Sequence, residues 1–178
     1  MISIIVPTLN EEKYVIKTLQ HLQEFRKKKI LEIILVDGLS QDNTLALSKD
    51  LCDIVITVKP GRADQLNAGA FEANNDLLLF MHADTIMDQE NIYELLEKYE
   101  NIEWGFFHLG FKSRTFKFKF LSYCINLRSI LFKYATGDQC LFVKKKLFKK
   151  VDGYGCLRLM EDVELSNKLL KITKPKIM

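Results

Sequence analysis

Residues 2–12 read ISIIVPTLNEE, and this stretch decides the fold class. Its first five residues form a short β-branched run, which is typical of a strand buried in a parallel sheet. The acids Glu11 and Glu12 follow, where they suit the positively polarised first turn of a helix, and Asn10 can cap that helix. The stretch therefore predicts a strand that passes through a short polar loop into a helix.

The same strand–loop–helix pattern recurs through the first half of the chain. Further strands are expected at residues 33–36, 54–58 and 77–81, and further helices at residues 40–50 (with Ser40 as the cap), 62–74 and 89–100. Strands separated by single helices predict a parallel sheet with right-handed crossovers. The 178 residues suit one domain. We therefore expect an α/β fold: a single domain with a Rossmann-like, mostly parallel sheet flanked by helices.

The second half of the chain changes character. Residues 104–111 predict a strand, and residues 112–150 are rich in basic and aromatic side chains, with Asp138 as their only acid. This basic segment predicts an amphipathic helix and then a strand near residues 140–143, and a last helix is expected over residues 161–171. Three interpretations of the segment stay open: a solvated helix face, a contact with anionic membrane lipid, or a site for a phosphate-bearing acceptor. RNA binding through aromatic stacking is a weaker fourth.

Bulk composition narrows the class of protein. A hydrophobic content of 48% argues against global disorder, and a formal net charge of +3 does not by itself indicate a nucleic-acid binder. The chain opens without a basic leader and no run approaches the ~18 apolar residues of a membrane helix, so neither a signal peptide nor a membrane span is expected. The cysteines form no CxxC pair, which favours reduced, mostly buried thiols in a cytoplasmic protein. They are Cys52, Cys124, Cys140 and Cys156.

Polar side chains follow the predicted strands of the first half. They are Thr8, Asn10, Glu11, Asp37, Arg62 and Asp84. The carboxyl ends of parallel strands share one edge of the sheet, and ligands bind beyond that edge. This convergence predicts a ligand site there.

Asp84 directly follows the fourth predicted strand. A carboxylate there can hold a divalent ion that clamps a diphosphate, or it can simply cap the next turn. His82 beside it can reach a metal or a phosphate, although a lone histidine is more often packed and hydrogen-bonded. Asp37 ends the second strand, where an acid can accept a hydrogen bond from a ribose hydroxyl or a base N–H. The loop after the first strand has no glycine, which argues against a dinucleotide site.

Glu161 and Asp162 open the last predicted helix. Adjacent acids at a helix start often only complement the helix dipole. One of them can instead be a general base that removes a proton from an acceptor hydroxyl. The residues alone leave both interpretations open.

Six motifs, in order along nearly the whole chain, resemble those of family 2 glycosyltransferases. They are residues 3–12 (SIIVPTLNEE), 36–44 (VDGLSQDNT), 61–70 (GRADQLNAGA), 80–85 (FMHADT), 137–139 (GDQ) and 160–165 (MEDVEL). Each motif alone is modest, but six in order are a specific signal. Within the family, the set is similar to the subgroup of radical-SAM/selenodomain-associated transferase 2.

The resemblance implies a GT-A fold and an inverting, metal-assisted transfer from a nucleoside-diphosphate sugar to a hydroxyl acceptor, with uridine favoured over guanosine as the base and Mn²⁺ or Mg²⁺ as the metal. It implies Asp162 as the catalytic base and Asp84 as the metal ligand. Asp138, Gln139 and Glu161 would lie on the acceptor or sugar side. The residues assigned to the nucleotide pocket are Pro7, Thr8, Glu11, Asp37, Arg62 and Ala83.

By the same resemblance, residues 1–100 form the nucleotide-sugar half and residues 101–178 the acceptor half of one glycosyltransferase domain. His82 stands where the family's metal motif usually has its first acid, so a single carboxylate would hold the metal. Relatives continue beyond Met178, so a short or truncated member is expected. We also expect a cytoplasmic protein with a lipid-linked acceptor, peripheral contact with the inner face of the membrane through residues 112–150, and no nucleic-acid partner.

Two other functions stay open. The first is a non-catalytic nucleotide-sugar-binding or scaffold protein that retains the fold, an alternative favoured by the short C-terminus. The second is a sugar-phosphate nucleotidyltransferase, which would need a glycine-rich basic loop after the first strand, whereas residues 7–12 are acidic. Donor hydrolysis or sugar transfer by the purified protein would exclude the scaffold.

Overall fold

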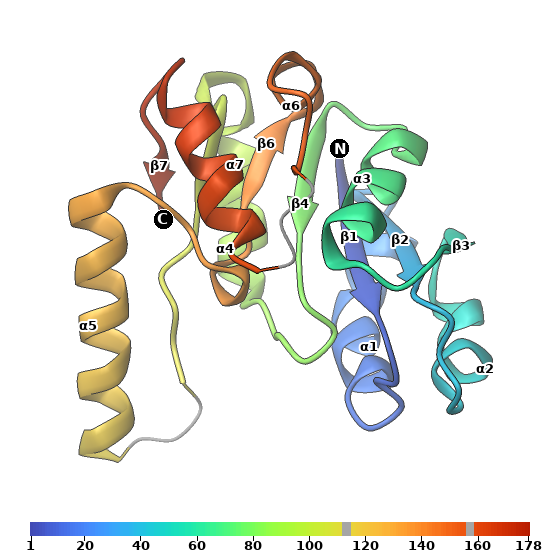
Figure 1. Ribbon diagram of the computed structural model, residues 1–178. Helices are drawn as coiled ribbons and strands as arrows, with labels where there is room; N and C mark the ends of the chain where they lie inside the picture. Colours follow the sequence, from blue (N-terminus) through green and yellow to red (C-terminus); the bar gives the residue numbers. More distant parts are fainter. Residues whose placement is uncertain (112–114, 156–158) are drawn as a thin grey trace.

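The computed structural model describes residues 1–111, 115–155 and 159–178 (Figure 1). Within these residues the strands form one seven-stranded sheet in the order β3-β2-β1-β4-β6-β5-β7. The strands are β1 (Ile2–Thr8), β2 (Leu31–Asp37), β3 (Ile54–Thr57), β4 (Leu77–Phe80), β5 (Trp104–Phe106), β6 (Phe142–Lys144) and β7 (Lys176–Ile177). β1 to β4 pair in parallel, β6 runs antiparallel to β4 and β5, and β7 is parallel to β5. The prediction of a mostly parallel α/β sheet is therefore confirmed.

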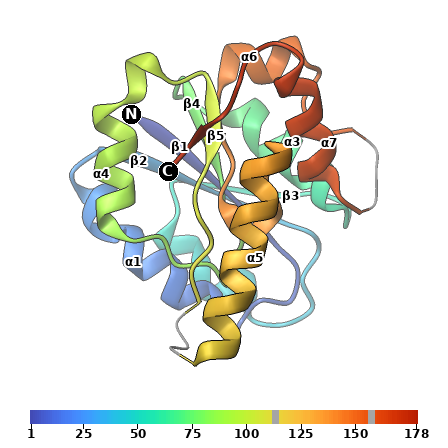
Figure 2. The same cartoon turned by 90° about the vertical axis from the view of Figure 1, so that its left-hand side faces the viewer.

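Helices cover both faces of this sheet (Figures 1 and 2). The α-helices are α1 (Val15–Lys27), α2 (Thr44–Ser48), α3 (Arg62–Glu72), α4 (Gln89–Glu97), α5 (Phe116–Phe132), α6 (Lys145–Lys150) and α7 (Glu161–Leu170), and the 3₁₀ turns are η1 (Lys49–Leu51), η2 (Tyr99–Asn101) and η3 (Gly137–Gln139). Alternate side chains of a strand point to opposite faces. Accordingly, Ile4 and Val6 of β1 pack in the core with α1 and α4, whereas Ile5 packs in the core with α3, α6 and α7.

The loops after β1 and β2 bind each other, which corrects the two predicted helix caps. Asn10 has a φ of 58°, and its backbone N–H donates to Ser40 Oγ at 2.9 Å. The side-chain oxygen of Asn10 accepts a hydrogen bond from the backbone N–H of Gln41 at 2.8 Å. Helix α1 begins only at Val15 and α2 only at Thr44. The prediction that Asn10 and Ser40 cap helices is wrong, because their hydrogen-bonding groups serve the loop–loop contact instead.

The second half contains the predicted helices α5 and α7, but its strands differ from the prediction. The strand expected over residues 104–111 ends at Phe106, and the backbone of Phe107 then bonds to Gln139 instead of to a neighbouring strand. Helix α6 was not expected, because its six residues are too few to show a helical apolar pattern. Strand β7 was not expected either, since its two residues are ordered by pairing with β5.

The described cysteines differ in their burial. Cys52 and Cys140 are free and buried, whereas Cys124 is free and exposed. Burial raises the pKa of the Cys52 and Cys140 thiols to about 12, which makes both poor nucleophiles.

None of the helices in the described parts of the chain combines the length and the apolar character that crossing a bilayer would need. Predictions that concern Lys112, Arg114 and Cys156 lie outside the described residues.

Candidate active site

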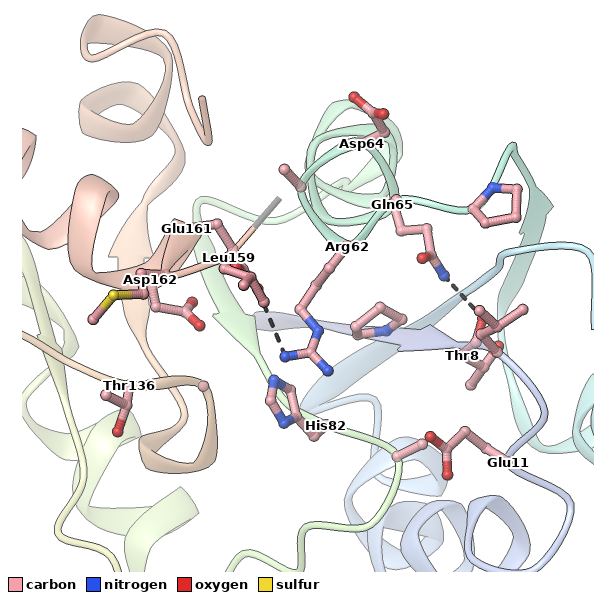
Figure 3. A pocket seen from close by; sticks show the side chains of 18 of the residues that line it. Thr8, Glu11, Arg62, Asp64, Gln65, His82, Thr136, Leu159, Glu161 and Asp162 are labelled. Carbon is pink, nitrogen blue, oxygen red and sulfur yellow. Dashed lines mark hydrogen bonds and ion pairs between the residues drawn. The ribbon is translucent and has the colours of Figure 1, made fainter. Parts of the chain in front are cut away.

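A cavity of about 920 Å³ lies beyond the carboxyl ends of β1 and β4, where the first turns of α3 and α7 also reach it (Figure 3). Most of the side chains predicted for a site line this one cavity. They are Pro7, Thr8, Glu11, Arg62, Ala83, Asp84, Glu161 and Asp162. The predicted residues Asp37, Asp138 and Gln139 do not line it; the last two line a smaller neighbouring cavity of about 410 Å³, which Asp84 also borders.

A buried network holds the ends of β1 and β2 together beneath the cavity. Gln65 of α3 donates from Nε2 to the carbonyl oxygens of Thr8 at 2.9 Å and Val36 at 2.8 Å (Figure 3). Thr8 Oγ1 donates to Asp37 Oδ1 at 3.1 Å, and Asp37 also accepts from the backbone N–H and the hydroxyl of Ser40. The Asp37 side chain is fully buried. Its predicted contact with the nucleoside stays a prediction, while its bonds to Thr8 and Ser40 shape the cavity floor.

The loop after β4 aims Asp84 at the cavity. Thr18 Oγ1 of α1 donates to the carbonyl oxygen of Ala83 at 2.6 Å, and the N–H of Thr85 donates to the carbonyl oxygen of His82 at 3.1 Å. Asp84 is left exposed between these two anchors. Burial and the negative charge of Asp84 raise the pKa of Glu11 across the cavity. The two carboxylates therefore create a negative region that a cation would relieve.

Arg62 brings the opposite charge into the cavity. Figure 3 shows its guanidinium extending from the start of α3 toward His82. Its Nη1 lies 3.6 Å from Oε1 of Glu161, a carboxylate that is almost fully buried, whereas about half of the Arg62 side chain is exposed. A guanidinium with free donors matches the geometry of a phosphate. Arg62 is thus placed to bind an anionic group that enters the cavity.

Asp162 is the buried acid on the opposite wall. Its Oδ1 accepts a hydrogen bond from the hydroxyl of Tyr154 at 3.0 Å. Burial and the neighbouring charge of Glu161 raise the pKa of Asp162 to about 6, although His82, Tyr154 and Arg62 each act to lower it. A carboxylate with a pKa close to neutral is well suited to accept a proton from a hydroxyl. A carboxylate in this environment can act as a general base, and the role of Asp162 as that base stays a prediction.

His82 connects the cavity to η3. Its Nδ1 lies 3.4 Å from Oδ1 of Asp138, and this hydrogen bond lowers the pKa of the Asp138 carboxyl. Gly137 sits against the histidine ring so closely that a methyl group there would clash with Cε1 and Nε2 of His82. The same methyl group would lie 3.1 Å from Oδ2 of Asp162. Glycine is therefore required for His82 and Asp162 to flank η3 as they do.

We expect Gly137→Ala to lower the free energy of unfolding by about 1–3 kcal/mol, because the histidine ring must move away from the new methyl group. Thermal unfolding would measure the loss. Gly110→Ala is the matched control, since a Cβ at Gly110 would meet no atom within 4 Å. Equal melting temperatures for the two variants would contradict the close packing of η3 on His82.

Sequence reasoning missed three residues that shape the site. Tyr154 binds Asp162 from a position eight residues earlier, and only the flanking glycines Gly153 and Gly155 mark the place in the sequence. Gln65 lies within the motif of residues 61–70, which by itself assigns it no role. Thr136 lines the cavity and forms a capping box with Gln139, a pairing that the T-x-x-Q pattern of η3 could have indicated.

The residues at Asp84 fit a divalent ion that is shared with a ligand. Among the described residues, no group of three or more His, Cys, Asp or Glu side chains could hold a metal on its own. Mg²⁺ commonly binds through one or two carboxylates plus substrate phosphates, and does not need a full protein cage. The exposed Asp84 with Glu11 nearby supplies such a donor set. Any cation here would complete its coordination with phosphate oxygens and water.

Comparison with known sequences identifies one family. The profile of Glycosyl transferase family 2 matches residues 3–139. A dolichyl N-acetyl-α-D-glucosaminyl phosphate 3-β-D-2,3-diacetamido-2,3-dideoxy-β-D-glucuronosyltransferase of Methanococcus voltae is 33% identical over 112 residues, which cover 57% of this chain and 35% of the relative.

Comparison with solved structures identifies the fold. S. aureus TarS 1–349 in complex with UDP superposes with a TM-score of 0.79 at 19% identity, covering 99% of this chain and 57% of TarS. The mannosyltransferase PcManGT of Pyrobaculum calidifontis, in complex with GDP-Man and Mn²⁺, superposes with a TM-score of 0.76 at 19% identity, covering 99% of this chain and 54% of PcManGT. The chain thus spans little more than half of these structures, and about a third of the Methanococcus voltae relative. The fold is the GT-A type that the sequence motifs imply.

Proposed function

Because the chain belongs to glycosyl transferase family 2, we propose that it transfers a sugar from a nucleoside-diphosphate donor to a hydroxyl acceptor, with inversion at the anomeric carbon. One observation carries the proposal. A single cavity joins an exposed acid for a metal (Asp84), a cation for a diphosphate (Arg62) and a buried acid whose pKa is raised to about 6 (Asp162). These are the three groups that a metal-assisted inverting transfer needs.

The donor is proposed to enter along the ends of β1 and β4. Pro7, Thr8, Glu11 and Ala83 line this part of the cavity and would contact the nucleoside. Asp37 would assist from beneath through its bond to Thr8. UDP and GDP-Man, bound in the structurally similar TarS and PcManGT, support a nucleoside diphosphate as the ligand class. We favour a UDP-sugar.

Arg62 would bind the diphosphate, and Asp84 would hold Mn²⁺ or Mg²⁺. The metal, when bound, would neutralise negative charge on the leaving diphosphate. The ion pair of Arg62 with Glu161 at 3.6 Å would help to direct the guanidinium toward the cavity, where it would meet the phosphates without a large rearrangement.

Asp162 would remove the proton from the acceptor hydroxyl. The hydroxyl oxygen forms its bond to the anomeric carbon while the bond from that carbon to the diphosphate oxygen breaks, and the nucleoside diphosphate leaves with the electron pair. The hydrogen bond from Tyr154 keeps the Asp162 carboxylate oriented toward the cavity. Glu161, Asp138 and Gln139 would lie on the acceptor or sugar side of this reaction.

The finer assignments are part of the same proposal. Residues 1–100 would bind the donor and residues 101–178 the acceptor. The acceptor would be lipid-linked, and the protein would work in the cytoplasm at the inner face of a membrane. Membership of the radical-SAM/selenodomain-associated transferase 2 subgroup is supported by the sequence motifs alone.

Calorimetric titration of the purified protein with UDP and GDP, each with and without Mn²⁺, tests the proposal. We expect UDP to bind, with an affinity that Mn²⁺ raises by about tenfold or more, because a cation held by Asp84 would neutralise charge on the phosphates. ADP is the control for a non-specific diphosphate contact. If neither UDP nor GDP bound in the presence of Mn²⁺, the cavity would not be a nucleotide-sugar site and a scaffold role would be favoured.

A further inference from the structure

Helix α5 presents polar side chains to the body of the protein. Ser122, Asn126 and Ser129 recur at helical spacing and share one face of α5. Asn126 accepts from the backbone N–H of Leu109 at 2.8 Å and donates to its carbonyl oxygen at 3.0 Å. Ser122 also donates to the carbonyl oxygen of Leu109, and Ser129 donates to Oε1 of Gln139 at 2.8 Å. The inward face of the helix is therefore polar and hydrogen-bonded.

The solvent-facing part of α5 is mostly apolar, and it includes Phe118, Leu121, Ile130 and Phe132 in addition to one continuous row of side chains. The side chains of this row follow one another at helical spacing, opposite the inward serines and asparagine. We call this set the outer stripe; it consists of Phe116, Phe120, Tyr123, Leu127 and Leu131, with exposed fractions of 83%, 59%, 62%, 40% and 66%. Figure 1 shows α5 at one side of the molecule, and in Figure 2, where this side faces the viewer, α5 lies in front. A continuous exposed stripe of large apolar side chains marks an interaction surface.

The charges around the outer stripe are all positive. From Trp104 to Gly137 the sequence contains no Asp or Glu. The first turn of α5 carries the exposed Lys117 and Lys119, and Arg128 and Lys133 lie near the end of the helix. Aromatic and aliphatic side chains flanked by cations are typical of helices that lie in the plane of an anionic membrane interface.

We propose that the outer stripe of α5 inserts into the surface of an anionic lipid bilayer, with Lys117 and Lys119 binding lipid phosphates. A second copy of the chain fits this surface less well. Two α5 helices paired about a two-fold axis would bring their cations together, with no acid on either helix to neutralise them. A bilayer rich in anionic headgroups satisfies both the apolar stripe and its charges.

The position of α5 connects this surface to the active site. The first turn of α5 extends toward the end of the molecule at which β1 and β2 terminate (Figures 1 and 2). The same helix bonds to Leu109 and Gln139, which line the smaller cavity beside Asp84. If the proposed function holds, a membrane bound at α5 would present a lipid-linked acceptor close to the reacting groups.

A second group of basic residues does not belong to this surface; it consists of Lys144, Lys145, Lys146, Lys149 and Lys150. Lys144 Nζ lies 3.4 Å from Glu103 Oε1, and Lys145 Nζ donates to the carbonyl oxygens of Phe71 and Ala73. Figures 1 and 2 place α6 at the other end of the molecule from the first turn of α5. The membrane contact predicted for residues 112–150 is therefore narrowed to α5.

Sedimentation with vesicles tests the proposal. Wild-type protein is expected to bind vesicles of phosphatidylcholine with phosphatidylglycerol, to bind pure phosphatidylcholine much more weakly, and to be released by salt. The double variant Phe116→Ser/Phe120→Ser should reduce partitioning by about tenfold or more, because two exposed aromatic rings no longer enter the interface. Lys117→Glu/Lys119→Glu should abolish the preference for the anionic vesicles.

Matched controls separate the surface from general effects. Phe71→Ser removes an aromatic ring that is 77% exposed on α3, and Lys149→Glu/Lys150→Glu reverses two exposed charges on α6; both should bind vesicles like wild type. Absence of wild-type binding to anionic vesicles, or an equal loss in these controls, would overturn the proposal. A different result would also overturn it: a wild-type protein that does not bind vesicles but is a dimer by light scattering, with the dimer lost in Phe116→Ser/Phe120→Ser. UDP titration of the wild-type protein is read separately: failure of nucleotide binding there would count against the proposed function alone, because vesicle binding is measured without nucleotide.

Discussion

Replacing Asp162 with Asn is expected to lower the rate of sugar transfer by about 10²–10⁴-fold while leaving UDP affinity within about twofold of wild type. An amide cannot accept the proton of the acceptor hydroxyl, yet its oxygen can still accept the hydrogen bond that Tyr154 donates at 3.0 Å. The measurement is release of UDP from the donor in the presence of the natural or a surrogate acceptor, together with calorimetric UDP binding. Full activity in the variant would remove Asp162 from the mechanism.

The pH dependence gives an independent check on the same residue. Asp162 has a pKa raised to about 6 by burial and by Glu161, so the wild-type rate should fall as the pH is lowered through about 6, where the base becomes protonated. Glu164→Gln, two residues further along α7, is the control and should keep both the rate and this profile. A profile that stayed flat between pH 5 and 7 (about one unit either side of that pKa) would contradict a base with this environment.

Thermal unfolding of Asp162→Asn shows whether a loss of activity in this variant comes from lost chemistry or from lost folding. The folded pKa of Asp162 lies above its ordinary value of 3.8, so the folded protein binds more protons than the unfolded chain between these values. The contribution of Asp162 to stability is therefore lost as the pH rises through about 6. At pH 8 the variant should unfold at a higher temperature than wild type, by an amount corresponding to at most about 3 kcal/mol.

Asp84→Ala is expected to abolish the effect of Mn²⁺ on UDP binding, which would weaken UDP binding in the presence of the metal by the same factor of about tenfold or more. The reason is that no group of three or more described His, Cys, Asp or Glu side chains could hold the ion by itself, so the ion would depend on Asp84 together with the phosphates. In the absence of metal the variant should bind UDP at least as well as wild type, since a negative charge facing the phosphates is gone. Calorimetry with and without Mn²⁺ measures both effects.

Asp64→Ala is the matched control for Asp84→Ala. Asp64 is also an exposed acid that lines the cavity, but Figure 3 shows its carboxylate on the outer side of α3, away from Arg62 and His82. It should retain the full response to Mn²⁺. An unchanged response in Asp84→Ala would place the metal elsewhere and leave Asp84 as a residue of the loop after β4.

The sequence by itself determined the architecture of the first half. The apolar runs and the helices between them predict that β1 to β4 are parallel, because each run is long enough to be recognised by its apolar pattern. The same reasoning placed Glu11, Arg62 and Asp84 at one edge of the sheet, since parallel strands end on the same side. These features depend on local pattern and on a general rule of topology, so the sequence alone determines them.

Tertiary structure decided what local pattern does not encode. The loops that hold Asn10 and Ser40 meet only after β1 and β2 pair, so these residues bind each other's loops instead of capping helices. Tyr154 reaches Asp162, and burial raises the pKa of that acid, only when α7 packs on the sheet. The orientation of α5 about its own axis also depends on tertiary structure. Its composition predicts a helix, but the hydrogen bonds of Asn126 to Leu109 decide that its polar side faces inward and its apolar side faces out. Contacts between residues far apart in the chain set each of these features, and a periodic pattern in one segment carries no information about which distant segment will lie against it.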